Sequence, residues 1–375
     1  MTEGAPLPDM RFAPPNPLRI ADRATGLNSV SVRSYNERLL LSLLLENESI
    51  SRFEIGEKTG LSAQTVSVLV RSLEKEGLVS KGEALKERGR VGPPTVPISL
   101  NPEGAYSVGI SMGYKHTEVV LIDFVGAVRF HSMLPNDGQS GKSNHPEFLQ
   151  TINEAIRKLP EGAGGRLAGI GLAFPEAKRD KNLKTDDYQL RQQALQEEIE
   201  SEIGIPVFVQ NDITAAASGE SMFGAAKPLS DYLFFYLGAE LHSRLILNHQ
   251  IYHGNSSLSF DVGIRRLETQ LHGQDISTDA LWDRSSQWPD YGETQKVWEA
   301  ELVERIRLSF ETLTQFVEMN TIVLSSYAPQ DICQKICEQL ESVAPGSKAM
   351  AGIINPSPKA IGAASLPFSS RFMVE

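Results

Sequence analysis

Residues 209–220 read VQNDITAAASGE, and this stretch marks the point where a strand gives way to a helix. The residues PVFVQ favour a strand, and we expect a helix from Ile213 onward. Asn and Asp are both preferred at the start of a helix, so Asn211 or Asp212 can cap it. A carboxylate in this position can also be a catalytic base. Other parts of the sequence are needed to tell whether Asp212 is a helix cap or a catalytic base.

The sequence before this stretch predicts a mixed sheet. AYSVGISMGYKHTEVVLIDFVGAVRFHSM reads as three consecutive strands with turns near Lys115 and at Gly126. A helix over residues 146–159, the strand LAGIGLAF and a second helix over residues 189–203 lead to PVFVQ. This order predicts a mixed sheet with helices on both faces.

A second, looser version of the pattern follows. Strands are predicted at DYLFFYLG, SRLILN and QIYHG, then helices to residue 319, the strand TIVLSS and a helix over residues 331–342. Two such halves hinged around a cleft are the architecture of the actin-like sugar kinases. We therefore predict an α/β body over residues 103–375, with lobes at roughly 103–215 and 216–375.

Length and composition predict an ordinary globular protein of two or three domains, with 375 residues of which 41% are hydrophobic. No run approaches the roughly 18 apolar residues of a membrane span, so we expect a cytoplasmic protein. Residues 1–30 are polar and proline-rich, and we interpret them as a flexible arm. Cys333 and Cys337 lie four apart on an expected helix, and no further cysteine or histidine cluster completes a metal site. Two reduced thiols are expected there.

Charge is distributed unevenly along the chain. The net charge is −11, yet the first 100 residues hold 13 Lys and Arg against 12 Asp and Glu. The acidic excess therefore lies in the body. A near-neutral head on an acidic body is compatible with DNA contact only where local basic groups are well placed.

The segment 31–102 predicts a small helical head. YNERLLLSLLLEN is leucine-dense and indicates a buried helix, and Ser51 with Glu54 forms a capping box that begins a second helix. Gly60 supplies a left-handed stop, and Ser62 can cap a third helix after a turn of about three residues. Three helices with so short a turn are typical of a helix-turn-helix.

The third helix has one apolar and one polar side. Apolar residues follow helical spacing at Val66, Leu69, Val70 and Leu73. The other side carries Gln64, Thr65, Ser67 and Arg71. These side-chain types reach base edges or phosphates when a helix enters the major groove.

A hairpin follows the three helices. LVSK and TVPISL predict two short strands, and Pro97 would make the second an edge strand. Arg88 and Arg90 flank Gly89 between them, which indicates the basic tip of a winged helix. A helix-turn-helix is also a common packing unit in proteins that do not bind DNA, but the basic wing favours DNA binding. We assign Gln64, Thr65 and Ser67 to base contact, and Arg71, Arg88 and Arg90 to phosphate or minor-groove contact.

From about Ser34 onward the chain resembles the ROK family, which groups sugar kinases with repressors that carry a winged helix in front of a kinase-like body. The head and RGRVGPPTVPISLNPEGAYSVGI are similar to the repressors' DNA-binding domain, wing and linker. VQNDITAAASGE matches the most recognisable segment of the kinase body. The resemblance implies a winged helix-turn-helix followed by an actin-like ATPase (ribonuclease-H-like) two-lobed ROK domain. Kinase members lack the first 100 residues, so the head indicates the repressor branch.

The resemblance also allows a test of the kinase chemistry. Phosphoryl transfer needs a carboxylate base, glycine-rich loops for ATP phosphates and Mg²⁺. The base position is kept, since Asn211 and Asp212 match the family's Asn-Asp pair. The first phosphate loop, approximately D-x-G-G-T-K, reads SMGYKH with Ser111 in place of the acid and Tyr114 in place of the second glycine.

The other nucleotide and metal elements depart further. The second loop, G-T-G-I-G-G-G in the family, reads GAELHSR, so Glu240 and Arg244 fill places where bare backbone should approach phosphate. In the sugar- and zinc-binding segment, Asp261 replaces a glutamate and Ile264 replaces a histidine, and the following cysteine cluster is missing. Ser325-Ser326 replaces a glycine pair beside the nucleotide. We therefore expect no catalysis, no catalytic residue beyond the former base position at Asp212, no metal and no cofactor.

These observations predict a DNA-binding transcriptional repressor of carbohydrate transport or metabolism genes. The expected partners are a double-stranded DNA operator, a sugar or sugar derivative held by Asn211, Asp212 and Asp261, and further copies of the chain in a homodimer or homotetramer. Two alternatives stay open: an active sugar kinase with an attached DNA-binding head, and a body that binds no small molecule and only dimerises.

Overall fold

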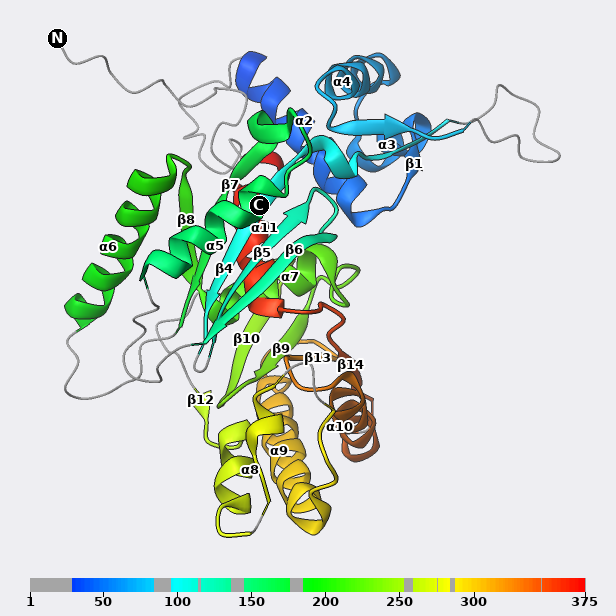
Figure 1. Cartoon of the computed structure of the whole chain (residues 1–375). Coiled ribbons are helices and arrows are strands. Elements are labelled where there is room, and N and C mark those ends of the chain that lie inside the picture. Colours follow the sequence, from blue (N-terminus) through cyan, green and yellow to red (C-terminus); the bar gives the residue numbers. More distant parts are fainter. Residues whose placement is uncertain are drawn as a thin grey trace.

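The computed structural model describes residues 29–83, 96–113, 116–135, 145–175, 185–252, 259–274, 276–283, 287–344 and 346–374 (Figure 1). The head consists of three helices and three strands: α2 (Ser29–Glu46), α3 (Arg52–Thr59), α4 (Ala63–Lys75), β1 (Ile50–Ser51), β2 (Val79–Lys81) and β3 (Pro97–Leu100). Residues 1–28, most of the expected arm, lie outside the described part of the chain. The winged helix-turn-helix architecture of the head is confirmed.

The predicted caps of the head helices are confirmed. The Glu54 N–H donates to Ser51 Oγ (3.2 Å), and the Ser51 N–H donates to Glu54 Oε2 (2.7 Å). Gly60 has φ +70° and ends α3. The Thr65 N–H donates to Ser62 Oγ (3.2 Å), so Ser62 begins α4. Short-range capping contacts thus fix where α3 ends and where α4 begins.

The prediction that Pro97 makes its strand an edge strand is wrong. The head sheet has the order β1-β3-β2, so β3 is its central strand. Pro97 is the first residue of β3, where the missing N–H is tolerated, and lies opposite Ser51 of β1. Its carbonyl still accepts the Gly82 N–H (2.9 Å). The partner β1 has only two residues, too few for a sequence pattern to predict it.

The first sheet of the body has the order β6-β5-β4-β7-β8. Its strands are β4 (Tyr106–Met112), β5 (His116–Asp123), β6 (Val128–Pro135), β7 (Leu167–Phe174) and β8 (Val207–Asn211). Helices α5 (His145–Arg157) and α6 (Thr185–Ile203) cover one face. Every residue of β4 is buried, as expected for a strand with both faces covered. The predicted mixed sheet is confirmed.

The second sheet has the order β11-β10-β9-β13-β14, and β12 pairs with β10. Its strands are β9 (Tyr232–Leu237), β10 (Leu241–Leu247), β11 (Gln250–Ile251), β12 (Ser259–Phe260), β13 (Thr321–Ser326) and β14 (Lys348–Ala351). Leu233, Phe235 and Leu237 of β9 pack under α8 (Ile264–Leu271), α9 (Gly292–Leu313) and α10 (Gln330–Val343). The alternate residues of β9 pack against α7 (Asp212–Phe223) on the other face. Helix α7 therefore faces the second sheet.

The last helix, α11 (Pro358–Phe372), returns to the first sheet although it lies in the range expected for the second lobe. It packs against β4, β7 and α7 (Figure 1). Glycines make this approach possible: a Cβ on Gly171 would lie 1.8 Å from the Ala363 carbonyl oxygen. A Cβ on Gly109 would lie 1.9 Å from that of Ala360. The layers of the body are thus α5/α6, first sheet, α11/α7, second sheet and α8–α10.

The head and the first sheet share one hydrophobic core. Side chains of α2, α3, α4, β2 and β3 form a continuous cluster with Phe124 and with residues of α11. The Phe124 ring lies edge-on to Phe368 (centroids 5.3 Å apart) and to Phe372 (5.0 Å). The head is therefore packed on the body rather than tethered to it. Within the described residues, no helix combines the length and apolar character needed to cross a bilayer.

Candidate functional site

Helix α4 carries the candidate DNA-binding face. Its four predicted core residues, Val66, Leu69, Val70 and Leu73, are buried. On the other side Gln64 and Arg71 are exposed, and Thr65 and Ser67 are half-buried. The Thr65 hydroxyl lies 2.8 Å from Ser62 Oγ, so it also takes part in the helix cap. The structure brings these four residues to one outer side of α4, and their contact with DNA stays a prediction.

Two exposed apolar side chains of the head were missed by sequence reasoning. Val68 of α4 is 53% exposed, and Phe53 in the first turn of α3 is 67% exposed. Val68 falls outside the i, i+3, i+4, i+7 set, which was the available signal. An exposed methyl-bearing side chain on such a helix suits contact with a thymine methyl group. Arg88 and Arg90 of the expected wing lie outside the described residues.

The second candidate site, called the interlobe site, consists of Asn211, Asp212, Arg244 and Lys359. Asn211 caps α7, because its Oδ1 accepts the N–H groups of Ile213 (2.9 Å) and Thr214 (3.1 Å). Arg244 of β10 donates from Nη2 to the same Oδ1 (2.6 Å) and from Nε to Thr214 Oγ1 (2.9 Å). The start of α7 is therefore joined to the second sheet by a guanidinium group.

Asp212 is 4% exposed and forms an ion pair with Lys359 in the first turn of α11. The Lys359 ammonium donates to Asp212 Oδ2 and also lies 4.5 Å from the centroid of the Tyr236 ring of β9. Asp212 Oδ1 is buried and has no hydrogen-bond partner among the described residues. One carboxylate oxygen is thus committed to a lysine, and the other is available to a donor such as a hydroxyl.

Asp261 is the third residue predicted to bind a ligand. This residue is exposed in the turn between β12 and α8, and within the described structure it makes no hydrogen bond to Asn211 or Asp212. Ile264, at the former histidine position, is fully buried at the start of α8. The described residues contain no group of three or more metal-binding side chains. The sharing of one ligand site by Asp261, Asn211 and Asp212 stays a prediction.

The loops that hold phosphate in a kinase make other contacts here. In residues 238–240, the Gly238 N–H donates to the Glu240 carbonyl (3.1 Å). The carbonyls of Gly238 and Ala239 accept the first N–H groups of α8, from Ile264 (2.8 Å) and Arg265 (3.1 Å). A phosphate-binding loop must point N–H groups at its ligand. This loop points carbonyls at a helix.

The serine pair that replaces the family's glycine pair is also engaged. Ser326 Oγ donates to the Leu237 carbonyl (2.7 Å), and Ser325 Oγ donates to Glu220 Oε1 (3.0 Å). Glu220 of α7 is fully buried. Its Oε2 accepts the N–H of Ala225 (2.9 Å) and its two oxygens accept those of Ile353 (3.3 Å) and Ile354 (3.4 Å). Burial raises the pKa of Glu220, and these hydrogen bonds oppose the rise.

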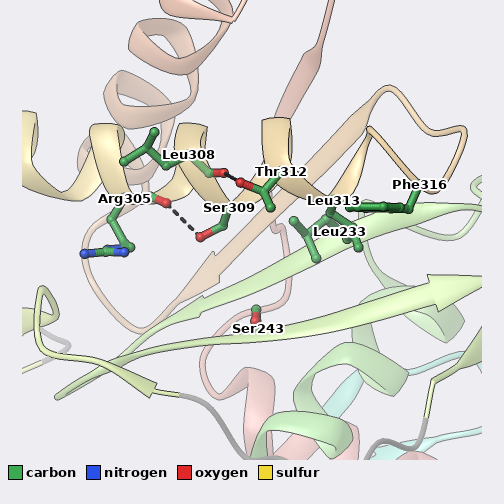
Figure 2. A pocket seen from close by; sticks show the side chains of 8 residues that line it. All are labelled: Leu233, Ser243, Arg305, Leu308, Ser309, Thr312, Leu313 and Phe316. Carbon is green, nitrogen blue, oxygen red and sulfur yellow. Dashed lines mark hydrogen bonds between the residues drawn. The ribbon is translucent and has the colours of Figure 1, made fainter.

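A hollow of about 410 Å³ lies on the other face of the second sheet (Figure 2). It is lined by Leu233, Ser243, Arg305, Leu308, Ser309, Thr312, Leu313 and Phe316. Ser243 and Arg244 are neighbours on β10, so their side chains point to opposite faces of the sheet. The sheet therefore separates this hollow from the interlobe site.

Comparison with known proteins follows the same division into head and body. Residues 33–80 match the model of the winged helix-turn-helix DNA-binding family, and residues 107–273 match the model of the ROK family. The chain carries a ROK-family domain behind a winged helix. The predicted resemblance to the repressor branch of the ROK family is confirmed.

Relatives of this chain include xylose repressors. The xylose repressor of Bacillus subtilis strain 168 is 27% identical over 294 residues, which cover 78% of this chain and 74% of that protein. The xylose repressor of Bacillus spizizenii is 31% identical over 236 residues, 62% of this chain and 60% of that protein. The matched part thus falls short of two thirds of the second repressor.

Solved structures show the same fold with and without a head. A ROK family transcriptional regulator described as a homologue of the E. coli Mlc protein superposes with a TM-score of 0.63, covering 90% of this chain and 96% of that one at 16% identity. A ROK family glucokinase from Streptomyces griseus, solved with glucose and AMPPNP, superposes with a TM-score of 0.52. The match covers 70% of this chain and 99% of the glucokinase at 16% identity. The two-lobed fold of the ROK domain is therefore shared with sugar kinases.

Proposed function

We propose that this ROK protein is a DNA-binding transcriptional repressor of sugar metabolism genes, in which the kinase-like domain senses a ligand and does not catalyse. The main support is the hydrophobic core that the head shares with Phe124 and α11. This core packs α4, with its exposed polar face, directly on the kinase-like domain. The repressor names of the relatives support a DNA operator and a sugar or sugar-derived effector. Paired half-sites favour at least a dimer.

The absence of kinase activity is argued from the loops. At residues 238–240 carbonyl oxygens are directed at α8, and Glu240 forms an ion pair with Arg265 (3.1 Å). A carboxylate about 4 Å from an ATP phosphate costs about 4 kcal/mol per charge pair at an effective dielectric of roughly 20. These contacts leave little reason for a triphosphate to bind beside Asp212.

The effector contacts are proposed at the interlobe site. Asp212 Oδ1 can accept a hydroxyl proton, and Asn211 can hydrogen-bond a second hydroxyl from its amide nitrogen. Asp261, exposed in the turn between β12 and α8, is proposed as a further acceptor for a ligand hydroxyl. Xylose is the first sugar to test, because both Bacillus relatives described above are xylose repressors.

The DNA-binding proposal is tested by selecting an operator from random duplexes and measuring affinity by fluorescence anisotropy. Gln64→Ala should lower the preference for the operator over random DNA by about 5- to 100-fold, as expected for a lost base contact. Arg71→Ala should weaken all sequences alike and flatten the salt dependence. Lys296→Ala removes an exposed positive charge from α9 in the body, so it is the control and should change neither quantity.

The wing is tested separately. Replacing Arg88 and Arg90 by Glu should abolish operator binding while the thermal unfolding profile stays unchanged. An operator affinity equal to the wild type at moderate salt would remove the wing from the proposal and leave α4 to act alone.

A sugar kinase is the second candidate function, because the family's base position is still occupied by Asp212 with one oxygen available. A coupled assay with ATP and Mg²⁺ across a panel of hexoses and pentoses separates the two. We expect no sugar-dependent turnover. Turnover that disappears in Asp212→Asn would contradict the proposal and establish an enzyme with a DNA-binding head.

A further inference from the structure

Helix α11 reaches from the interlobe site to the DNA-binding head. It has 15 residues, Pro358–Phe372, and is therefore about 22 Å long. Lys359 lies in its first turn, and Ser369, Ser370 and Phe372 lie in its last turn. One continuous helix therefore contacts both the interlobe site and the head.

The first turn of α11 is held by both neighbouring layers. The Lys359 ammonium pairs with Asp212 at the start of α7 and lies over the Tyr236 ring of β9. The Lys359 side chain is 16% exposed and that of Asp212 is 5% exposed, so water screens this pair little. A ligand hydroxyl that binds Asp212 therefore acts on a group that α11 also holds.

The last turn of α11 is held by the first helix of the head. Arg38 of α2 is 3% exposed and donates to the carbonyls of Ser369 (3.3 Å) and Ser370 at the C-terminal end of α11. The Ser369 carbonyl also accepts the N–H of Met373, the C-cap residue of α11 (3.4 Å), and a cation is favoured at this end of a helix. Ser42 Oγ accepts the N–H of Val374 (2.9 Å). The head is thus bonded to the end of α11 as well as packed on it.

The middle of α11 is packed tightly against the backbone of its neighbours, so little space is left for a local displacement. A Cβ on Gly109 or Gly171 would lie within 2 Å of its backbone, and a Cβ on Gly362 would lie 1.9 Å from the Ala215 carbonyl of α7. Tightly packed elements change position as units rather than deform. A shift imposed at the first turn must therefore appear at the last turn.

We propose that α11 is the link through which the interlobe site controls the DNA-binding head. A ligand that binds Asp212 alters the ion pair between Asp212 and Lys359, and α11 shifts as a result. This shift changes the hydrogen bonds between residues 369–374 and α2. The inference deepens the proposed function and rests on it, because it requires a ligand at Asp212 and DNA at the head. Reciprocity then requires operator binding to alter the interlobe site in turn.

Hydrogen exchange with mass spectrometry tests the link without DNA or ligand. Lys359→Met keeps the aliphatic stem and removes the ammonium. We expect at least tenfold faster exchange in peptides covering residues 368–374 and 38–46 at the far end of α11. Lys335→Met is the matched control, since Lys335 pairs with the buried Glu299 (2.7 Å) away from α11, and exchange at the head should stay within twofold of the wild type. Head exchange in Lys359→Met equal to that control would overturn the link.

Ser42→Ala tests the link from the other end. It removes the acceptor of the Val374 N–H, and we expect faster exchange at Ile361, whose N–H donates to the Ser357 carbonyl (2.9 Å). Unchanged exchange at Ile361 would also contradict the link. The outcome is separable from the proposed function. If the variants change exchange at the far end of α11 but the protein binds no operator, only the proposed repressor function is contradicted. If a sugar releases the operator but the variants leave exchange at the far end unchanged, only the link through α11 is contradicted.

Discussion

Glu220 is the residue at which the two lobes meet. The chain passes between the sheets twice, once after α7 through Ala225 and once before α11 through Ile353 and Ile354, and all three N–H groups donate to Glu220. Ser325 at the end of β13 donates to it as well. Each hydrogen bond to a buried carboxylate is worth more than one in water. Glu220 therefore joins both segments that connect the two sheets to the end of β13.

The buried carboxyl group makes stability depend on pH in a defined direction. Burial raises the pKa of Glu220 above its ordinary value of 4.5, so the folded state binds this proton more tightly than the unfolded state. Its contribution to the free energy of unfolding is therefore full below about pH 4.5 and is lost as pH rises through the folded pKa. Urea unfolding of wild type and Glu220→Gln should show a stability difference that shrinks with rising pH.

Glu197→Gln makes the same chemical change at an exposed position of α6 and is the control for this measurement. A constant difference for Glu220→Gln would mean that Glu220 has the same pKa in the folded and unfolded states, contrary to its burial.

Among the elements, α11 depends most on close backbone approach. Gly171→Ala places a Cβ 1.8 Å from the Ala363 carbonyl, so α11 or β7 must move. Overpacking of this kind should lower the free energy of unfolding by about 2–3 kcal/mol or more. Gly164→Ala is the control, because nothing lies within 4 Å of its Cβ. Chemical unfolding measures both, and equal stability of the two variants would contradict the close packing of α11.

The elements that the sequence predicts well are those with strong local signals. The capping box at Ser51, the stop at Gly60 and the buried side of α4 depend on contacts within a few residues, so spacing alone identifies them. Helix α11 has Gly362 and Pro367 in PKAIGAASLPFSSRF, both poor helix formers, and its stability comes from packing on the first sheet. It could not be predicted from propensity.

The same limit applies to the interlobe site. Asn211 and Asp212 were identified from one motif, and the cap role of Asn211 follows from its position before α7. Lys359 is 147 residues away from Asp212 and lies on the helix that was not predicted. The sequence predicts that the Arg244 side chain fills a place where bare backbone should approach phosphate. It does not predict the hydrogen bonds of Arg244 to Asn211 and Thr214, because these depend on how the two sheets face each other. Long-range partners of this kind have no local sequence signal.

The whole molecule is a winged-helix head packed on a two-lobed body. The shared core at Phe124 and α11 places the head on the first sheet, while Arg244 and Lys359 connect the first sheet to the second. A ligand between the lobes can therefore change the head only through its different affinity for two arrangements of these contacts. The acidic body and the near-neutral head also favour DNA contact at the head alone.

The most direct test of this account measures operator affinity of the full chain across a panel of sugars at one fixed salt concentration. The account predicts a selected operator bound at about 10⁻⁸ M or tighter, at least about 10³-fold more tightly than random DNA. At least one sugar should change that affinity by about fivefold or more, and Asp212→Asn should lose this response. Binding of the operator no tighter than random DNA would contradict the account.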